Sequence, residues 1–249
     1  MIWRIFCLSC ALAFAVAAVS QLLSTLRDRP LIAFASTLER ADSLAPASEA
    51  LLARLRSEIE RRDGCEQSLA RSRVSASLFL LDHTSADDPQ ERYRRLAFSE
   101  EQARRALACN PMDGNLWFVA GWLGFQLAPN AGLLHEHLLS AIRYAPYQGT
   151  ALSRRWRVLA PSLAALGFAH DPRVIEDLER LYRLSTPRMA ASVHEALRAN
   201  GSGEIALAML DALPSERKAA VERAILIVAA PSPARREFLR FGPRDSAAD

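Results

Sequence analysis

The chain has 249 residues, half of them apolar, so it can bury a sizeable core and its composition does not predict disorder. Its 31 Lys+Arg residues and 28 Asp+Glu residues leave a net charge of +3, and Lys218 is the single lysine. A charge this small and this evenly interleaved does not indicate nucleic-acid binding. Composition therefore favours a folded body, and we predict no nucleic-acid partner.

The first 30 residues predict a membrane-targeting segment. Arg4 precedes an apolar run over residues 5–23, about 19 residues, which at ~1.5 Å per helical residue just reaches across a bilayer core of ~30 Å. Residues 15–17 (AVA) also form a small-x-small cleavage signal. We expect residues 1–30 to be a signal peptide or a transmembrane anchor. The body then lies outside the bacterial cytoplasm, at the inner membrane or in the periplasm; a cytoplasmic body is the alternative.

The rest of the sequence predicts helices. Apolar residues recur at three- and four-residue spacing, and no run alternates strictly between apolar and polar residues as a half-buried strand does. We expect one all-α domain over residues 31–242 and a disordered tail over residues 243–249. The expected helices cover residues 47–64, 65–83, 89–109, 114–127 and 133–144, followed by helices that start at residues 172, 187, 203 and 215.

Three helix starts have a strong local signal, because each pairs an N-cap side chain with a proline at the first helical position. They are Asp88-Pro89, Asp171-Pro172 and Thr186-Pro187.

One stretch predicts a repeated unit. The sequence ALACNPMDGNLW, residues 106–117, aligns with AIRYAPYQGTAL, residues 141–152, after a shift of about 35 residues. In both stretches a small residue near the end of a helix is followed five residues later by a proline, which cannot continue that helix. A period of this length is typical of helical hairpins.

This pattern resembles the tetratricopeptide-repeat family. In that family a Trp-like residue and a glycine lie four apart in the first helix of each hairpin, and an alanine of the second helix precedes a proline by five residues. One repeat, residues 114–148, matches well, although Gly124 stands where the family has a large aromatic residue. The matching positions are Trp117, Gly121, Ala141 and Pro146, with Ala106 and Pro111 matching the end of the preceding repeat.

The resemblance implies helical hairpins stacked in a right-handed superhelix, preceded by the apolar signal or anchor helix. It implies that Trp117 is buried beside Gly121, where the two helices approach closely. It also implies a protein-binding scaffold rather than a catalyst, which is an analogy at the level of the fold.

Cys65 and Cys109 are the two cysteines beyond the leader. If residues 65–83 and 89–109 form an antiparallel hairpin, the first helix begins where the second ends, and the two sulfurs meet. An extracytoplasmic body would then carry a disulfide worth about 3 to 4 kcal/mol. The alternative is a pair of buried thiols.

His135 and His137 do not predict a metal site. Residues two apart on a helix point about 200° apart, so one ion cannot bind both from one face. We expect surface or interface histidines, and we predict no metal ion and no cofactor.

The sequence SRRWRVLAPSL contains the one basic cluster with an aromatic residue. Trp156 follows the apolar stripe and is expected in the core, whereas Arg154, Arg155 and Arg157 are expected on the exposed side. They are candidates for binding an acidic protein partner or the carboxylates of a polysaccharide. A merely solvated arginine face is the alternative.

These patterns favour a non-enzymatic, membrane-associated scaffold that holds protein partners together at the bacterial envelope. Small signal-bearing chains with one recognisable repeat of this kind resemble accessory proteins of surface-polysaccharide (exopolysaccharide or O-antigen) assembly and export. Two rival classes are a carbohydrate-active enzyme that uses paired acids such as Glu176 and Asp177, and a purely structural subunit of an envelope complex. Against the enzyme, adjacent residues on a helix point about 100° apart.

Overall fold

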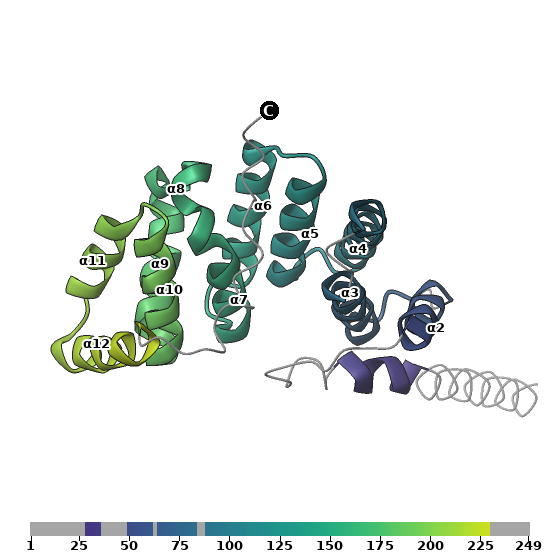
Figure 1. Ribbon diagram of the computed structural model, residues 1–249, viewed down its shortest axis with the longest axis horizontal. Coiled ribbons are helices and arrows are strands. Elements are labelled where there is room, and N and C mark those ends of the chain that lie inside the picture. Colours follow the sequence, from purple (N-terminus) through teal and green to yellow (C-terminus); the bar gives the residue numbers. More distant parts are fainter. Residues whose placement is uncertain (1–27, 36–48, 62–63, 84–87, 230–249) are drawn as a thin grey trace, which may run out of the picture. The chain divides into compact units, whose positions relative to one another are not determined.

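The computed structural model describes residues 28–35, 49–61, 64–83 and 88–229. Within these ranges every regular element is an α-helix or a short 3₁₀ helix, so the all-α prediction is confirmed (Figure 1). None of the described helices is both long and apolar enough to cross a membrane. Residues 1–27 of the predicted targeting segment lie outside the described residues, and so does the whole of the tail predicted for residues 243–249.

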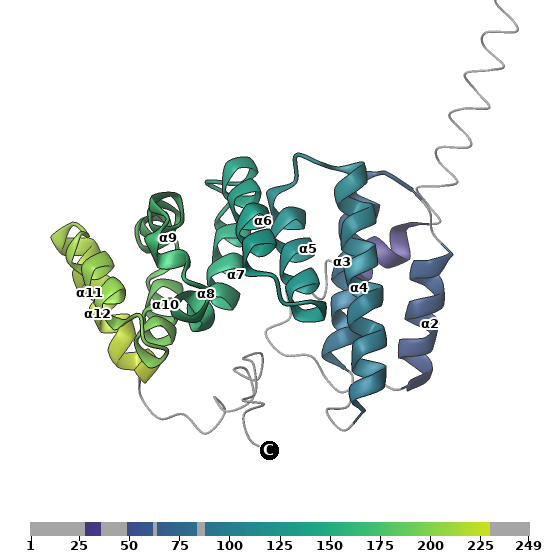
Figure 2. The same cartoon turned by 90° about the horizontal axis from the view of Figure 1, so that it is seen from above.

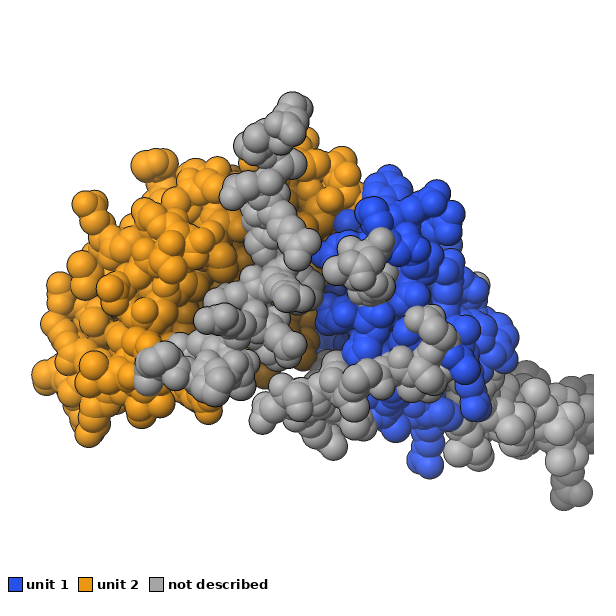
Figure 3. Space-filling model, in the orientation of Figure 1, with its two compact units in different colours: residues 1–110 blue, residues 111–249 orange. Residues whose placement is uncertain are grey.

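The chain divides into two compact units, Met1–Asn110 and Pro111–Asp249 (Figure 3). The sequence predicted one domain over residues 31–242, and the structure has two units in that range. No change in composition marks the boundary, because both units are built from the same kind of amphipathic helix. Each unit is described by itself below.

Unit 1 contains a short helical segment over residues 28–35 and three longer helices, α2 (Glu49–Glu60), α3 (Gln67–Asp82) and α4 (Pro89–Cys109). Helices α2 and α4 both pack against α3 (Figure 2). Helix α4 begins as its sequence predicts, since the Asp88 side chain accepts a hydrogen bond of 2.9 Å from the backbone N–H of Glu91.

The core of unit 1 is apolar and lies along α3. The Phe34 and Phe79 rings meet edge to face, with their centroids 5.4 Å apart. Two buried polar contacts also link the helices of the α3–α4 hairpin: the Ser99 hydroxyl donates to the backbone carbonyl of Ser77 at 3.0 Å, and the Arg73 guanidinium donates to Gln102 Oε1 at 2.7 Å. The buried apolar members are Leu31, Leu52, Leu55, Ile59, Leu69, Ala76, Phe79 and Leu80.

Unit 2 begins with a helical hairpin made of α5 (Gly114–Leu127) and α6 (Ala131–Tyr144). It continues with α7 (Gly149–Leu159), the 3₁₀ turn η1 (Ala160–Ser162), α8 (Leu163–Leu166) and the 3₁₀ turn η2 (Phe168–His170). The last four helices are α9 (Pro172–Leu184), α10 (Pro187–Ala199), α11 (Gly203–Asp211) and α12 (Ser215–Ala229).

Beyond α6, unit 2 departs from simple consecutive hairpins. Helix α7 passes directly into η1 at Pro161, and Gly167 then adopts φ 69°, a left-handed conformation that turns the chain between α8 and η2. Helix α7 packs against α9, and α10 packs against both α11 and α12. The right-handed superhelix implied by the resemblance therefore stays a prediction.

Candidate functional site

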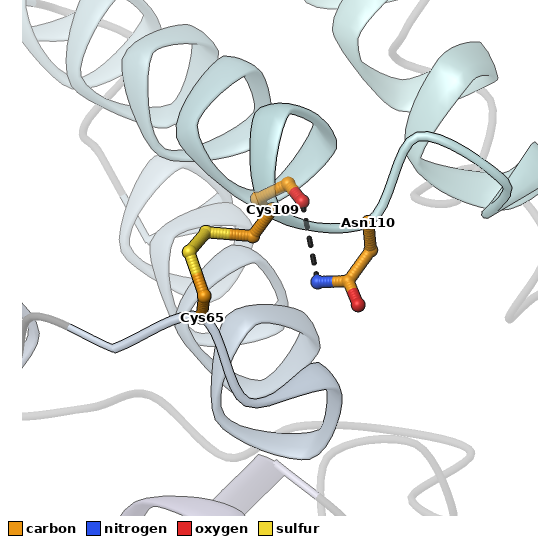
Figure 4. Close-up of a disulfide and its surroundings, with 4 residues drawn as sticks. Cys65, Cys109 and Asn110 are labelled. Atoms are coloured by element: carbon orange, nitrogen blue, oxygen red, sulfur yellow. Dashed lines mark hydrogen bonds between the residues drawn. A yellow bond between two sulfur atoms is a disulfide. The ribbon is translucent and has the colours of Figure 1, made fainter.

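A disulfide closes the α3–α4 hairpin of unit 1. Cys65 lies just before α3 and Cys109 is the last residue of α4, so the antiparallel pairing brings their Cα atoms to 5.0 Å and the structure joins the sulfurs (Figure 4). Asn110 follows at once, and its backbone and side-chain N–H groups both donate to the Ala106 carbonyl, which ends the helix. Ala106 itself is buried.

The α5–α6 hairpin has the close approach that the sequence pattern predicts. A Cβ atom added to Gly121 would lie 2.5 Å from the His137 Cβ, and one added to Gly114 would lie 2.6 Å from the Ala141 carbonyl oxygen. Ala141 is fully buried. Small residues at these positions are therefore required by contact between α5 and α6. Pro146 lies in the turn before α7, where its ring prevents α6 from continuing.

Trp117 is the member of the repeat pattern whose predicted burial is wrong. Its side chain is only half-buried. The indole N–H donates to the Pro111 carbonyl at 2.7 Å, and the ring lies 5.3 Å from His137 and 6.4 Å from Tyr144, centroid to centroid. The indole is therefore only partly buried, and it packs against the His137 ring, which itself faces Gly121.

Arg155 was expected on the exposed side of α7, and this is also wrong. The side chain is fully buried and forms a two-pronged ion pair with Asp177 of α9, with Nε–Oδ2 at 2.9 Å and Nη2–Oδ1 at 2.7 Å. The Trp156 indole donates to the same carboxylate at 2.8 Å. Burial is tolerated because the charges are paired in a fork geometry. Arg155 therefore joins α7 to α9 and is not available to a partner.

The other two arginines of the cluster are exposed, as predicted. Arg154 and Arg157 lie on the solvent side of α7, whereas Trp156 is fully buried in the core of unit 2. A helix that buries residues 155 and 156 presents residues 154 and 157 to the other side. The structure thus separates the predicted cluster into one structural ion pair and two surface cations.

An open pocket of about 580 Å³ lies in unit 2, where the start of α6 meets η2 and the start of α9. Its single carboxylate belongs to Asp171, which caps α9 and accepts hydrogen bonds from the Arg173 guanidinium. These hydrogen bonds are the main reason why the pKa of Asp171 lies below its ordinary value. His135 Nε2 lies 3.0 Å from the same carboxylate.

This lining does not supply the pair of carboxyl groups about 5 to 10 Å apart that glycoside hydrolysis requires. The acids named for that rival are placed differently as well. Asp177 is buried against Arg155, while Glu176 is exposed and binds Arg180 of its own helix. The two carboxylates do not face a common cavity.

His135 and His137 lie on different faces of α6, as their spacing predicts. His135 packs on Phe168 at 4.9 Å between ring centroids, and His137 packs on Trp117. Burial lowers the pKa of His137 below its ordinary value. Within the described part of the chain no group of His, Cys, Asp and Glu side chains is arranged to hold a metal ion.

Sequence reasoning missed the aromatic residues around Trp117. Tyr144 precedes Pro146 and Tyr147 follows it, while Met112 lies just before α5. Tyr147 and Met112 are among the most exposed large side chains of the described residues. Their proximity to the repeat prolines was the available signal. The repeat pattern counts only buried positions, so it gives no weight to residues at the open end of a hairpin.

The fold and these contacts define an all-α protein of packed helices that contains one tightly paired hairpin and one disulfide-closed hairpin. Comparison with protein-family models, with curated proteins and with solved structures finds no match for the chain.

Proposed function

We propose that the protein is a non-enzymatic, membrane-associated scaffold of the bacterial envelope that binds protein partners. The observation that carries the proposal is the close packing of α5 on α6 at Gly121 and Gly114, two small residues of one helical hairpin. Such hairpins are units that recognise other proteins through surface side chains, while their small residues serve only to pack the helices. The divergent repeat assignment is part of the same proposal.

The envelope location is supported by the pair of cysteines. A disulfide that closes a hairpin persists in an oxidising compartment and is reduced in the cytoplasm. The leader over residues 1–30 supplies the route out of the cytoplasm. The leader either remains as an inner-membrane anchor or is cleaved to release the body into the periplasm.

The cellular process rests on the resemblance alone. We propose an accessory role in the assembly or export of a surface polysaccharide. Arg154 and Arg157, the two exposed members of the basic cluster, are the candidate contacts for acidic groups of a partner or for polysaccharide carboxylates.

The proposal is tested by cross-linking in living cells of the bacterial host, followed by purification of the tagged chain from detergent-solubilised membranes. We expect one or a few envelope proteins to be recovered in a fixed ratio to the chain. Recovery should fall for the Arg154→Gln/Arg157→Gln variant but not for the control Arg188→Gln, which removes an exposed arginine on α10. Cross-linking to no envelope protein would contradict the scaffold.

A further inference from the structure

The end of the α5–α6 hairpin that lies opposite its connecting turn carries a group of aromatic and cationic side chains. Helix α5 starts and α6 stops at this end, so residues before α5 lie beside residues after α6. We call the group the aromatic edge. It consists of Met112, Trp117, Arg143, Tyr144, Tyr147 and Arg180.

Ring and cation contacts join five of the six members of the group. The indole of Trp117 and the ring of Tyr144 are inclined by 25° to each other, with centroids 6.4 Å apart. The guanidinium carbon of Arg143 lies 5.8 Å from the centre of the Tyr144 ring, and that of Arg180 lies 5.5 Å from the centre of the Tyr147 ring. Tyr147 follows Tyr144 by three residues, which keeps their Cα atoms within about 11 Å. The contacts therefore join Trp117, Tyr144 and Arg143 in one set and Tyr147 and Arg180 in a second, and the short segment from Tyr144 to Tyr147 connects the two sets.

The apolar members are exposed well beyond what folding requires. Tyr147 is 72% exposed and Met112 is 70% exposed. Aromatic residues, methionine and arginine are the residue types enriched in the buried centres of protein interfaces. Methionine is flexible and polarizable, so it adapts to an irregular apolar surface and is common at protein-binding surfaces.

The charge of the aromatic edge is positive. Among the residues that the structure describes, no carboxylate pairs with Arg143, whose guanidinium instead rests on Tyr144. Arg180 pairs with Glu176 of its own helix and its Nη1 lies 4.0 Å from Asp177 Oδ1, so the surplus positive charge of the group comes from Arg143. The acid nearest in sequence to Trp117 is Asp113, which is buried and accepts from the backbone N–H groups of Asn115 and Leu116. The accessible charge therefore suits a negatively charged ligand.

We propose that the aromatic edge binds an acidic segment of a protein partner, with an apolar or aromatic side chain of that segment against Tyr147 and Met112 and its carboxylates on Arg143 and Arg180. This inference rests on the proposed scaffold function and names the surface and the chemistry of the partner. Arginine recognises carboxylates through two parallel N–H donors, and the rings hold the guanidinium groups in place.

The test is selection of a displayed random peptide library on the intact chain, followed by binding measurements with the selected synthetic peptides. We expect peptides rich in Asp and Glu around one large apolar residue. Tyr147→Ser and the double variant Arg143→Gln/Arg180→Gln should each weaken binding about tenfold or more. Tyr93→Ser, which removes an exposed tyrosine of unit 1, and Arg188→Gln/Arg223→Gln are matched controls and should bind normally.

Failure to select any peptide, selection without acidic preference, or equal binding by edge variants and wild type would each overturn the proposal. Polygalacturonate is tested in parallel: binding of this polymer through the same residues, with no peptide binding, would assign the aromatic edge to a uronic-acid polysaccharide instead. Cross-linking in cells separates the two claims. If Tyr147→Ser still captures the envelope partner, the scaffold stands and the aromatic edge is not its docking site.

Discussion

At the scale of single residues, Asp177 is the polar centre of the α7–α9 contact. It accepts hydrogen bonds from the Arg155 guanidinium and from the Trp156 indole, and all three side chains are fully buried. A buried arginine depends on its counter-charge far more than a surface arginine does, because water cannot replace the lost partner. The interior of unit 2 is therefore sensitive to one carboxylate.

We expect Asp177→Asn to lower the free energy of unfolding of unit 2 by about 3 to 5 kcal/mol, since it leaves the Arg155 charge buried without a carboxylate. Glu176→Gln is the matched control, because it removes the neighbouring carboxylate from an exposed ion pair and should cost less than about 1 kcal/mol. Urea unfolding of the two variants measures both effects. Equal losses would show that the buried pair does not stabilise the α7–α9 contact.

His194 makes the stability of unit 2 depend on pH. Burial lowers its pKa from the ordinary value of 6.5, and its Nδ1 lies 3.2 Å from the Tyr182 hydroxyl. The unfolded chain therefore binds a proton that the folded chain does not, so stability is full above pH ~6.5 and falls as pH drops below that value toward the folded pKa.

We expect the melting temperature of wild type to fall between pH 7 and pH 5 more steeply than that of His194→Gln. Because both chains share every other titrating group, the difference between them isolates His194. His170→Gln removes an exposed histidine and should retain the wild-type slope. If the melting temperatures of wild type and His194→Gln fell equally between pH 7 and pH 5, His194 would not be kept neutral by folding.

At the scale of elements, the α5–α6 hairpin offers a direct comparison of two glycines on one helix. A Cβ atom at Gly121 would lie 2.5 Å from His137, whereas one at Gly124 would meet no atom within 4 Å. We expect Gly121→Ala to lower the free energy of unfolding by about 1 to 3 kcal/mol, because the added methyl group overpacks the contact. We expect Gly124→Ala to raise it by about 0.5 to 1 kcal/mol, because alanine favours a helix more than glycine does. Thermal unfolding measures both, and an unchanged or raised melting temperature of Gly121→Ala would mean that α5 and α6 are not in close contact at Gly121.

The sequence predicted correctly those features that depend on residues close together along the chain. The starts of α4, α9 and α10 fall at Pro89, Pro172 and Pro187 as predicted, because capping is a contact between residues a few positions apart. Gly121 and Ala141 were identified through the resemblance to the tetratricopeptide-repeat pattern, which places small residues where two helices of a hairpin meet. In the structure Gly121 meets His137, and Ala141 meets Gly114.

The wrong predictions involve partners that the period does not specify. Arg155 lies next to the buried Trp156 on α7, and its burial is favourable only because Asp177 of α9 pairs with it. Trp117 has the residue type of the repeat pattern, but Pro111, His137 and Tyr144 hold it at the hairpin end. The aromatic edge was missed because exposed positions have no periodic signal.

At the scale of the whole molecule, the two units have separate cores, and the disulfide belongs to unit 1 alone. We expect two calorimetric transitions. Cys65→Ser/Cys109→Ser should lower the free energy of unfolding of unit 1 by about 4 kcal/mol, because it opens a loop with a sequence separation of 44. The transition of unit 2 should be unchanged. Gly121→Ala should lower only the transition that the cysteine variant spares. A single transition moved by both changes would show that the units unfold together.

We propose that the body of the protein is exported and works in the envelope, and the redox state of Cys65 and Cys109 in the native compartment decides between this location and the cytoplasm. Cells are lysed under denaturing conditions without reductant, free thiols are alkylated at once, and the peptides containing Cys65 and Cys109 are analysed by mass spectrometry. We expect that neither cysteine is alkylated and that the linked peptides weigh two hydrogens less than the reduced pair. Alkylation of both cysteines in protein taken from its native compartment would contradict the disulfide in the cell and the export of the body with it.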